Sequence, residues 1–195
     1  GTASEAVRAG ASVITSARRG KGISMSEGVQ HATNDIIVFL DGDIDPYPAE
    51  TITRLAGPVI RDEADFVKAT FSRNAGRVTE LLAKPLLTLL YPELCNFNQP
   101  LSGMIAGRRK MFGQIDFLHD YGVDIGILID MFLMGARIEE ADIGFIQNKS
   151  KPWHSLAKMS TEVAGAILQK SLTYRIDTQS PSDARSFSPI KKVEL

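Results

Sequence analysis

The stretch IIVFL-DGDID, residues 36–45, decides the fold of this 195-residue chain. Residues 36–40 form an unbroken apolar run rich in β-branched and aromatic side chains, which is typical of a buried strand in a parallel sheet. Strand and helix patterns alternate through the first seventy residues, and this alternation predicts βαβ units and a mostly parallel sheet. Because such sheets bind ligands at the carboxyl ends of their strands, the candidate site lies directly after Leu40.

The remaining elements follow from apolar periodicity and from the positions of glycine and proline. Helices are expected at residues 3–9, 23–32, 49–60, 78–91, 123–134 and 155–171, and further strands at residues 12–16, 65–71, 104–107 and 137–145. The chain turns polar after residue 172, which is typical of a linker or a disordered end. We therefore expect one α/β domain over residues 1–171 and a polar C-terminal tail or linker over residues 172–195.

Composition narrows the functional classes. The 22 basic and 23 acidic residues give a net charge of −1, so no nucleic-acid partner is expected. No apolar run reaches the ~20 residues that span a bilayer, so no membrane span is expected. Cys95 is the single cysteine and cannot form an internal disulfide, which fits a reducing, cytoplasmic location.

Asp41 and Asp43 are the leading candidates for a metal site. Two carboxylates separated by Gly42 can turn toward one ligand, because glycine permits a tight backbone path and a close approach. Mg²⁺ and Mn²⁺ bind one or two carboxylates together with phosphate oxygens, so the pair predicts a metal that clamps a diphosphate. A solvated acidic turn and a response-regulator-like aspartate remain open alternatives. An EF-hand is excluded, since Pro46 and Ile52 stand where its glycine and glutamate belong.

A basic turn, Arg19-Gly20-Lys21-Gly22, precedes this strand by one helix. It is not a phosphate loop of the Walker type, because Thr15 stands at the first glycine position and Gly22 follows the lysine in place of serine or threonine. A lysine at a helix entrance nonetheless suits a phosphate group, through its charge and the helix dipole. The turn predicts either a phosphate contact through Lys21 or a solvated basic turn.

Further motifs carry a resemblance when they are read in order. They are GRVTEL at residues 76–81, KPLL at 84–87, QPLSG at 99–103, AGRR at 106–109 and YGVDIG at 121–126. Together with the DGD and GKG segments, this ordered set resembles the glucosyl-3-phosphoglycerate synthases, a family of retaining glycosyltransferases, over roughly residues 1–171. The resemblance implies an α/β fold of the GT-A-like (Rossmann-like) kind, with a mostly parallel sheet flanked by helices.

On the donor side, the resemblance implies roles for five residues of this chain. The diphosphate of the sugar donor and a Mg²⁺ or Mn²⁺ ion would be held by Asp41, Gly42 and Asp43. Lys21 would lie near the nucleotide sugar. Asp124 would lie near the transferred sugar as the catalytic residue, at a position where the family usually has glutamate.

On the acceptor side, the resemblance implies that the phosphate and carboxylate of 3-phosphoglycerate are held by Gly76, Arg77, Val78 and Thr79. Arg77 suits this role chemically, since its planar guanidinium can bind phosphate through paired hydrogen bonds. A surface arginine ahead of a helix is the alternative interpretation.

The chain departs from the family pattern in two places. The family usually has a metal-binding histidine after its last strand, and Asn148 occupies that position here, so that Asn148 or His154 would complete the metal site. A lone histidine beside Trp153 is, however, more often structural. Residues 1–3 resemble the end of a turn after the family's second strand, so strands that bind the base, on the order of 60 residues, are expected to lie upstream.

The expected activity is transfer of a sugar, glucose in the first instance, from a nucleoside diphosphate sugar to 3-phosphoglycerate with retention. A related transferase with another donor or acceptor, such as a mannosyl donor, stays open. So does a non-catalytic fragment that keeps the fold. Assays with a panel of donors and acceptors distinguish the related transferase from the expected activity. Calorimetry of Mn²⁺ binding distinguishes the non-catalytic fragment from an enzyme. The apolar helices at residues 81–91 and 123–134 leave room for a homodimer, although burial in the core is their expected use.

Overall fold

The computed structural model describes residues 1–16, 18–44, 46–72, 76–146 and 152–178. In this part of the chain, four strands form one sheet in the order β1-β3-β2-β4. The strands are β1 (Ile36–Phe39), β2 (Phe66–Ser72), β3 (Ile105–Arg108) and β4 (Ile138–Phe145). β3 pairs antiparallel with both β1 and β2, whereas β2 and β4 pair in parallel. β1, β2 and β4 therefore run in one direction, and their carboxyl ends meet at one edge of the sheet.

The apolar run that decides the fold forms β1, but its pairing differs from the prediction. β1 is half-buried, and within the described sheet it pairs only with the antiparallel β3. Its residues are all apolar because its two faces meet different clusters, with Ile37 and Phe39 on one side and Ile36 and Val38 on the other. The expected parallel pairing of this strand is therefore wrong. The predicted mostly parallel sheet holds for the strand directions, because β3 is the one reversed strand among the four described. It does not hold for the pairings, because both neighbours of β3 pair with it in the antiparallel sense.

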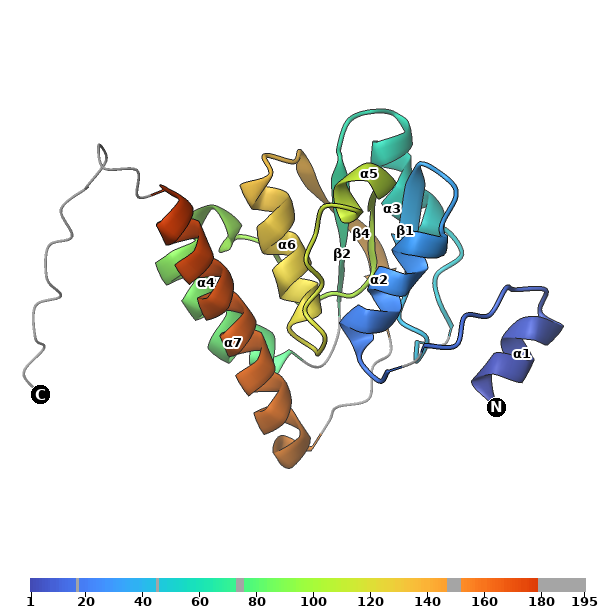
Figure 1. The fold of residues 1–195 in the computed structure, drawn as a ribbon, viewed down its shortest axis with the longest axis horizontal. Coiled ribbons are helices and arrows are strands. Elements are labelled where there is room, and N and C mark those ends of the chain that lie inside the picture. The colour runs from blue at the N-terminus through green and yellow to red at the C-terminus, as the bar shows by residue number, and fades with distance from the viewer. Residues whose placement is uncertain (17, 45, 73–75, 147–151, 179–195) are drawn as a thin grey trace, which may run out of the picture.

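Helices cover both faces of the sheet, as expected for an α/β fold. α3 (Thr51–Ile60) packs on one face, where Leu55 and Val59 join a cluster with side chains of the strands. α2 (Lys21–His31) and α6 (Val123–Leu133) contribute to the larger cluster on the other face. α7 (Trp153–Thr178) packs against α6 and α4 (Lys84–Leu90), and Figure 1 shows it on the outside of this layer.

Three expected elements differ in the structure. Residues 12–16 form no strand, because no described segment pairs with their backbone. The expected helix at residues 78–91 divides into a π-helical turn, η1 (Thr79–Ala83), and α4, with Pro85 in the first turn of α4, where its missing N–H is tolerated. α7 continues to Thr178, so residues 172–178 of the expected tail are helical, and the rest of that tail lies outside the described residues.

The remaining helices are short. α1 (Thr2–Arg8) buries none of its residues, and Figure 1 shows it apart from the body of the molecule. α5 (Arg109–Phe112) and the 3₁₀ turn η2 (Pro92–Leu94) flank β3 in the sequence and were not expected. None of the helices in the described part of the chain combines the length and the apolar character that crossing a bilayer requires.

Candidate functional site

The candidate site lies at the edge of the sheet where β1 and β2 end and β3 begins. Asp41 and Asp43 follow β1, residues 76–79 follow β2, and Ser102 and Gly103 precede β3. These segments converge because β1 and β2 run in the same direction and β3 runs back between them. The expectation that functional residues follow Leu40 agrees with this arrangement.

A cavity of about 550 Å³ opens at this edge and collects the residues predicted for the donor side. Its lining includes Lys21, Asp41, Gly42, Asp43 and Asp124. Leu101, Tyr121 and Met159 also line it, so the same space offers both charged and apolar contacts. A ligand with a phosphate part and a less polar part fits such a lining.

Lys21 is the electrostatic centre of the cavity. Its ammonium group donates hydrogen bonds to Asp41 Oδ1 at 3.0 Å and to Asp124 Oδ2 at 2.7 Å. Burial alone would lower the pKa of Lys21, but the carboxylates of Asp124 and Asp41 outweigh burial, and its pKa lies above the ordinary value. Lys21 is therefore a fixed positive charge held between two carboxylates.

Two glycines explain how Lys21 reaches both carboxylates. A Cβ on Gly22 would fall on the carbonyl group of Leu118, and a Cβ on Gly20 would lie 2.5 Å from the carbonyl oxygen of His119. Because these neighbours are backbone atoms, they cannot move aside as the end of a side chain can. The glycines let the start of α2 pack directly on the loop that precedes α6, and this packing places Lys21 beside Asp124.

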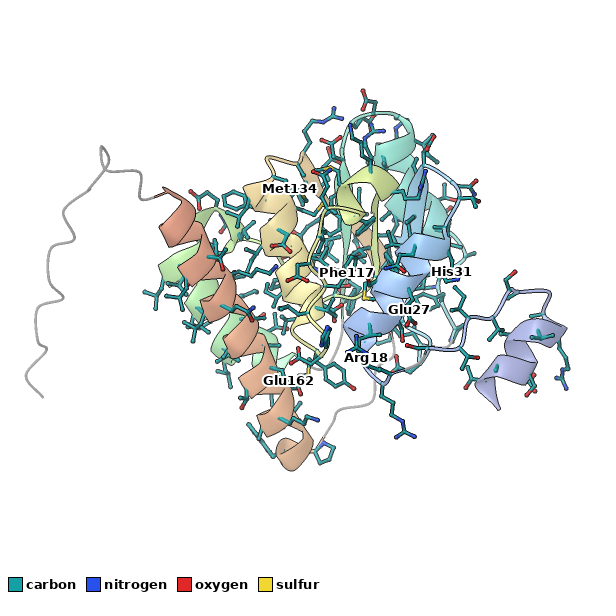
Figure 2. The ribbon with its side chains drawn as sticks, in the orientation of Figure 1. Arg18, Glu27, His31, Phe117, Met134 and Glu162 are labelled. Carbon is teal, nitrogen blue, oxygen red and sulfur yellow. The ribbon has the colours of Figure 1, made fainter. Side chains whose placement is uncertain are left out.

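The loop before α6 is held in turn by α7. A Cβ on Gly122 would lie 2.8 Å from Ala166 Cβ, so only glycine permits this close packing of the two helices. Glu162 of α7, labelled in Figure 2, accepts a hydrogen bond of 3.2 Å from the backbone N–H of Tyr121. These contacts fix the start of α6, which presents Asp124 to the cavity.

Asp124 has one oxygen that the described residues leave without a hydrogen bond. Its side chain is only 7% exposed, and Oδ2 bonds to Lys21, whereas Oδ1 is buried and finds no partner. Burial raises the pKa of Asp124, and the positive charges of Lys21 and Lys68 oppose this effect. A buried acceptor without a partner is costly, so Asp124 is held in place by its other contacts rather than by Oδ1.

Lys68 and Ser102 are buried behind the cavity wall, and the sequence pattern assigns neither of them a role. Lys68 lies in β2 with no exposed surface, and its ammonium group donates to the backbone oxygens of Ser102 at 2.8 Å and Asp124 at 3.1 Å. The available signal was a lysine in the segment FVKATFS, residues 66–72, whose pattern predicts a buried strand. A charged side chain at such a position indicates a specific polar partner.

The loop that carries Asp41 and Asp43 is held by Tyr47. The hydroxyl group of Tyr47 donates to the backbone oxygen of Asp41 at 2.8 Å. Burial and the carboxylate of Asp41 raise the pKa of Tyr47 to about 12, so the hydroxyl group keeps the proton that it donates. Tyr47 was not predicted, because a single tyrosine after an acidic turn carries no pattern.

Gly103 makes room for the Lys21–Asp41 pair within the protein. A Cβ on Gly42 would meet nothing within 4 Å, and its φ lies outside the left-handed region. A Cβ on Gly103 would collide with Lys21 Nζ and lie 2.6 Å from Asp41 Oδ1. No protein atom therefore requires glycine at position 42, and the room that Gly42 leaves for a ligand stays a prediction, whereas Gly103 provides the space that the Lys21–Asp41 pair occupies.

The residues predicted for the acceptor lie at the same edge of the sheet but do not line this cavity. Gly76 has a φ of 143°, which favours glycine, and Val78 and Thr79 are buried. The guanidinium carbon of Arg77 lies 4.6 Å from the ring centre of Trp153, at the start of α7. The structure thus places the acceptor residues on a separate segment, after β2.

The cavity fits a divalent cation in part. Asp41 and Asp43 offer the one or two carboxylates that Mg²⁺ or Mn²⁺ requires, with the other ligands supplied by phosphate and water. Within the described residues, no group of three or more histidine, cysteine, aspartate or glutamate side chains is placed to hold a metal. Asn148 and the side chain of His154 lie outside the described part, so their roles as ligands stay predictions.

Comparison with known proteins identifies the family. The sequence profile of glycosyl transferase family 2 matches residues 2–115. The chain is 36% identical over 166 residues to the glucosyl-3-phosphoglycerate synthase of Petrotoga mobilis, which covers 78% of this chain and 51% of the relative. The corresponding enzyme of Mycolicibacterium smegmatis is 35% identical over 188 residues, with 85% and 62% covered. The chain therefore spans about half the length of the first of these relatives and 62% of the second.

Solved structures agree with the sequence comparisons. Glucosyl-3-phosphoglycerate synthase from Mycobacterium tuberculosis in complex with phosphoglyceric acid matches with a TM-score of 0.82 and 34% identity, over 87% of this chain and 64% of that chain. Its complex with Mn²⁺, UDP-glucose and phosphoglyceric acid matches with a TM-score of 0.81 and 34% identity, over the same shares. These matches confirm the predicted GT-A-like fold and the predicted resemblance. Because the family profile covers more than half of its length, the chain belongs to glycosyl transferase family 2.

Proposed function

We propose that this chain forms the metal, donor and acceptor site of a transferase that moves glucose from UDP-glucose to 3-phosphoglycerate, with retention at the anomeric carbon. The observation that carries the proposal is the Asp41–Lys21–Asp124 bridge inside one cavity, with Asp43 in the same lining. Supporting it, the similar M. tuberculosis enzyme has been solved with Mn²⁺, UDP-glucose and phosphoglyceric acid.

On the donor side, each residue has a separate task. Bound Mg²⁺ or Mn²⁺ supplies positive charge that stabilises the departing diphosphate. Asp41 and Asp43 hold that cation, and Lys21 adds a second positive charge for the phosphate oxygens. Asp124 lines the cavity, so its carboxylate accepts a hydrogen bond from a sugar hydroxyl and orients the anomeric carbon.

On the acceptor side, Arg77 binds the phosphate of 3-phosphoglycerate through its planar guanidinium, with its other face stacked toward Trp153. Gly76, Val78 and Thr79 complete this segment, whose backbone N–H groups suit the acceptor carboxylate. In the reaction, the bond from the anomeric carbon to the diphosphate breaks, the bond to the acceptor hydroxyl forms, and the hydroxyl proton is released. Positioning and charge stabilisation supply most of the rate enhancement.

Calorimetry of the 195-residue chain tests the proposal. Mn²⁺ is titrated first, followed by UDP-glucose and then 3-phosphoglycerate, with GDP-mannose as the competing donor. We expect Mn²⁺ binding, Mn²⁺-dependent binding of UDP-glucose, and binding of 3-phosphoglycerate that Arg77→Gln weakens. Asp43→Ala, which removes an exposed side chain, is expected to abolish the Mn²⁺ signal while the fold persists. A chain that binds neither Mn²⁺ nor 3-phosphoglycerate contradicts the proposal, and a preference for GDP-mannose favours the mannosyl alternative.

Location and assembly complete the proposal. We propose a cytoplasmic protein, on the ground that its single cysteine, Cys95, is free and fits a reducing compartment. Homodimer formation stays a prediction; Leu81 and Leu89 expose apolar surface near α4, whereas Leu87 between them is buried in the core. Sedimentation analysis of the chain at several concentrations checks the oligomeric state.

A further inference from the structure

Lys68 occupies a position where a charge is costly. It lies in β2 with no exposed surface, on the same face of the sheet as Phe66, whose ring centre is 6.0 Å from its Nζ. Burial lowers the pKa of Lys68 to about 8, and the negative charge of Asp124 opposes this effect. An apolar side chain would fill the position without loss of hydration, so any benefit of the lysine comes from the groups that its ammonium contacts.

Those contacts are the backbone oxygens of two segments that form the cavity wall. Ser102 O, at 2.8 Å, lies just before β3, and Asp124 O, at 3.1 Å, lies in the first turn of α6. The residue after Ser102 is Gly103, whose missing Cβ leaves space for Lys21 and Asp41. One ammonium group therefore connects the central strand to both segments.

The same ammonium belongs to a balanced group of charges. Lys21 bonds to Asp41 and Asp124, and Asp124 is the strongest electrostatic partner of Lys68. The two lysines match the two aspartates. Without Lys68, the two carboxylates would lose one of two nearby positive charges, and the start of α6 would lose its hydrogen bond to β2. Both hydrogen bonds of Lys68 reach the wall that carries Asp124, and neither reaches the loop that carries Asp43.

We propose that Lys68 is a positioning residue for the donor sugar: it holds the backbone of Ser102 and Asp124 so that the Asp124 carboxylate faces the transferred sugar. Lys68 does not itself touch the donor. This inference rests on the proposed function, because it assigns the sugar to the wall formed by Asp124. The inference assigns the two parts of the donor to different residues. Asp41 and Asp43 bind the diphosphate through the metal, and the wall that Lys68 supports binds the sugar.

The test compares UDP-glucose with UDP, both with Mn²⁺, by calorimetry of the 195-residue chain and its Lys68→Met variant. We expect Lys68→Met to weaken UDP-glucose binding ~10-fold and to change UDP binding less than about threefold, because only the sugar contact is displaced. Added to Asp124→Asn, Lys68→Met is expected to cause little further loss. A general loss of structure would weaken both nucleotides alike, and that result would overturn the inference.

Lys170→Met is the matched control. Lys170 also holds α6, through a 2.7 Å bond to Asp130, and both side chains are largely buried. It is expected to lower Tm without changing the ratio of UDP-glucose to UDP affinity; a change as large as that of Lys68→Met contradicts the inference. If Lys68→Met does not fold, Lys68→Gln takes its place, because glutamine can still donate one or two hydrogen bonds. Lys68→Gln must then lose affinity for UDP-glucose alone, and by a smaller factor. A wild-type chain that binds neither Mn²⁺ nor either nucleotide overturns the proposed function and the inference with it, whereas equal losses of the two nucleotides in Lys68→Met overturn the inference alone.

Discussion

Lys21 shows how single residues concentrate charge at the edge of the sheet. Its ammonium group lies between Asp41 and Asp124, in a space that exists because Gly103 has no side chain. Gly20 and Gly22 are required for a different reason, since their missing Cβ atoms let α2 approach backbone. The glycines around Lys21 therefore have two roles. Gly20 and Gly22 allow close packing on backbone atoms, and Gly103 leaves space for the Lys21–Asp41 pair.

Gly103→Ala tests the second purpose. The added Cβ collides with Lys21 Nζ and Asp41 Oδ1, which are ends of side chains and can shift, so the fold is expected to survive while the cation site is distorted. We expect Mn²⁺ affinity to fall ~10-fold, with a small change in Tm, in calorimetry and thermal melts. Gly165→Ala is the control, because its Cβ meets nothing within 4 Å and Gly165 lies in α7, outside the cavity lining. If both variants bind Mn²⁺ like the wild type, Gly103 has no role in the site.

At the scale of elements, Asp65 connects three strands at the edge of the sheet opposite to the cavity. It precedes β2, accepts hydrogen bonds from Arg108 at the end of β3 at 3.0 Å, and accepts others from Arg137 just before β4 at 2.9 Å. The hydrogen bonds from Arg137 lower the pKa of Asp65 below its usual range, against the effect of burial. This ion cluster fixes the start of β2 and β4, and the other end of β2 leads to the candidate site.

Asp65→Asn is expected to lower Tm at neutral pH by roughly 3–8 °C, because charge-assisted hydrogen bonds become neutral ones. The folded pKa is depressed, so the stabilisation is present above the unfolded pKa of about 4 and is lost as pH falls through the folded value. Melting curves of wild type and variant, measured from pH 7 downward, are expected to converge in acid. Glu63→Gln, in an exposed pair with Arg61, is the control and should change Tm little. A constant difference between wild type and Asp65→Asn at every pH would contradict the assignment.

At the scale of the molecule, the candidate site joins parts that are distant in the chain. β1 supplies Asp41, α2 supplies Lys21 and α6 supplies Asp124, while α7 supports α6 from outside (Figure 1). A ligand that contacts all of these segments binds the folded chain and not the unfolded one. Ligand binding should therefore stabilise the whole chain.

Mn²⁺ is accordingly expected to raise Tm, by an amount that depends on its concentration. At 100 times the dissociation constant the stabilisation is about 2.7 kcal/mol, equal to roughly 5–10 °C for a chain of this size. Removal of the metal with a chelator should reverse the shift, and Asp43→Ala should show none. A shift of equal size in Asp43→Ala would mean that the metal stabilises the chain elsewhere.

Several parts of the fold and site follow from local sequence. The run at residues 36–40 predicts a strand because both of its faces are apolar, and the acidic turn after it predicts a cation site because Asp41 and Asp43 supply hard oxygen ligands. The GKG turn predicts a lysine that contacts a phosphate group. The order of the motifs predicts the family, since that order depends on the whole chain rather than on any single residue.

Other parts depend on contacts between distant segments, which periodicity does not encode. An apolar strand carries no information about its partner, so the antiparallel β3 between β1 and β2 could not be predicted. Gly42 and Gly103 look alike in the sequence, and only the packing around Lys21 distinguishes them.

The sequence by itself determined the residue types of the site, its place after an apolar strand, and the family. Only the tertiary structure decided which groups share the cavity, that Lys21 joins Asp41 to Asp124, and that the buried Lys68 holds the wall behind them. The physical reason is that the pattern of apolar and polar residues reports whether each residue is buried. A hydrogen bond between segments up to 103 positions apart depends instead on how the helices pack on the sheet.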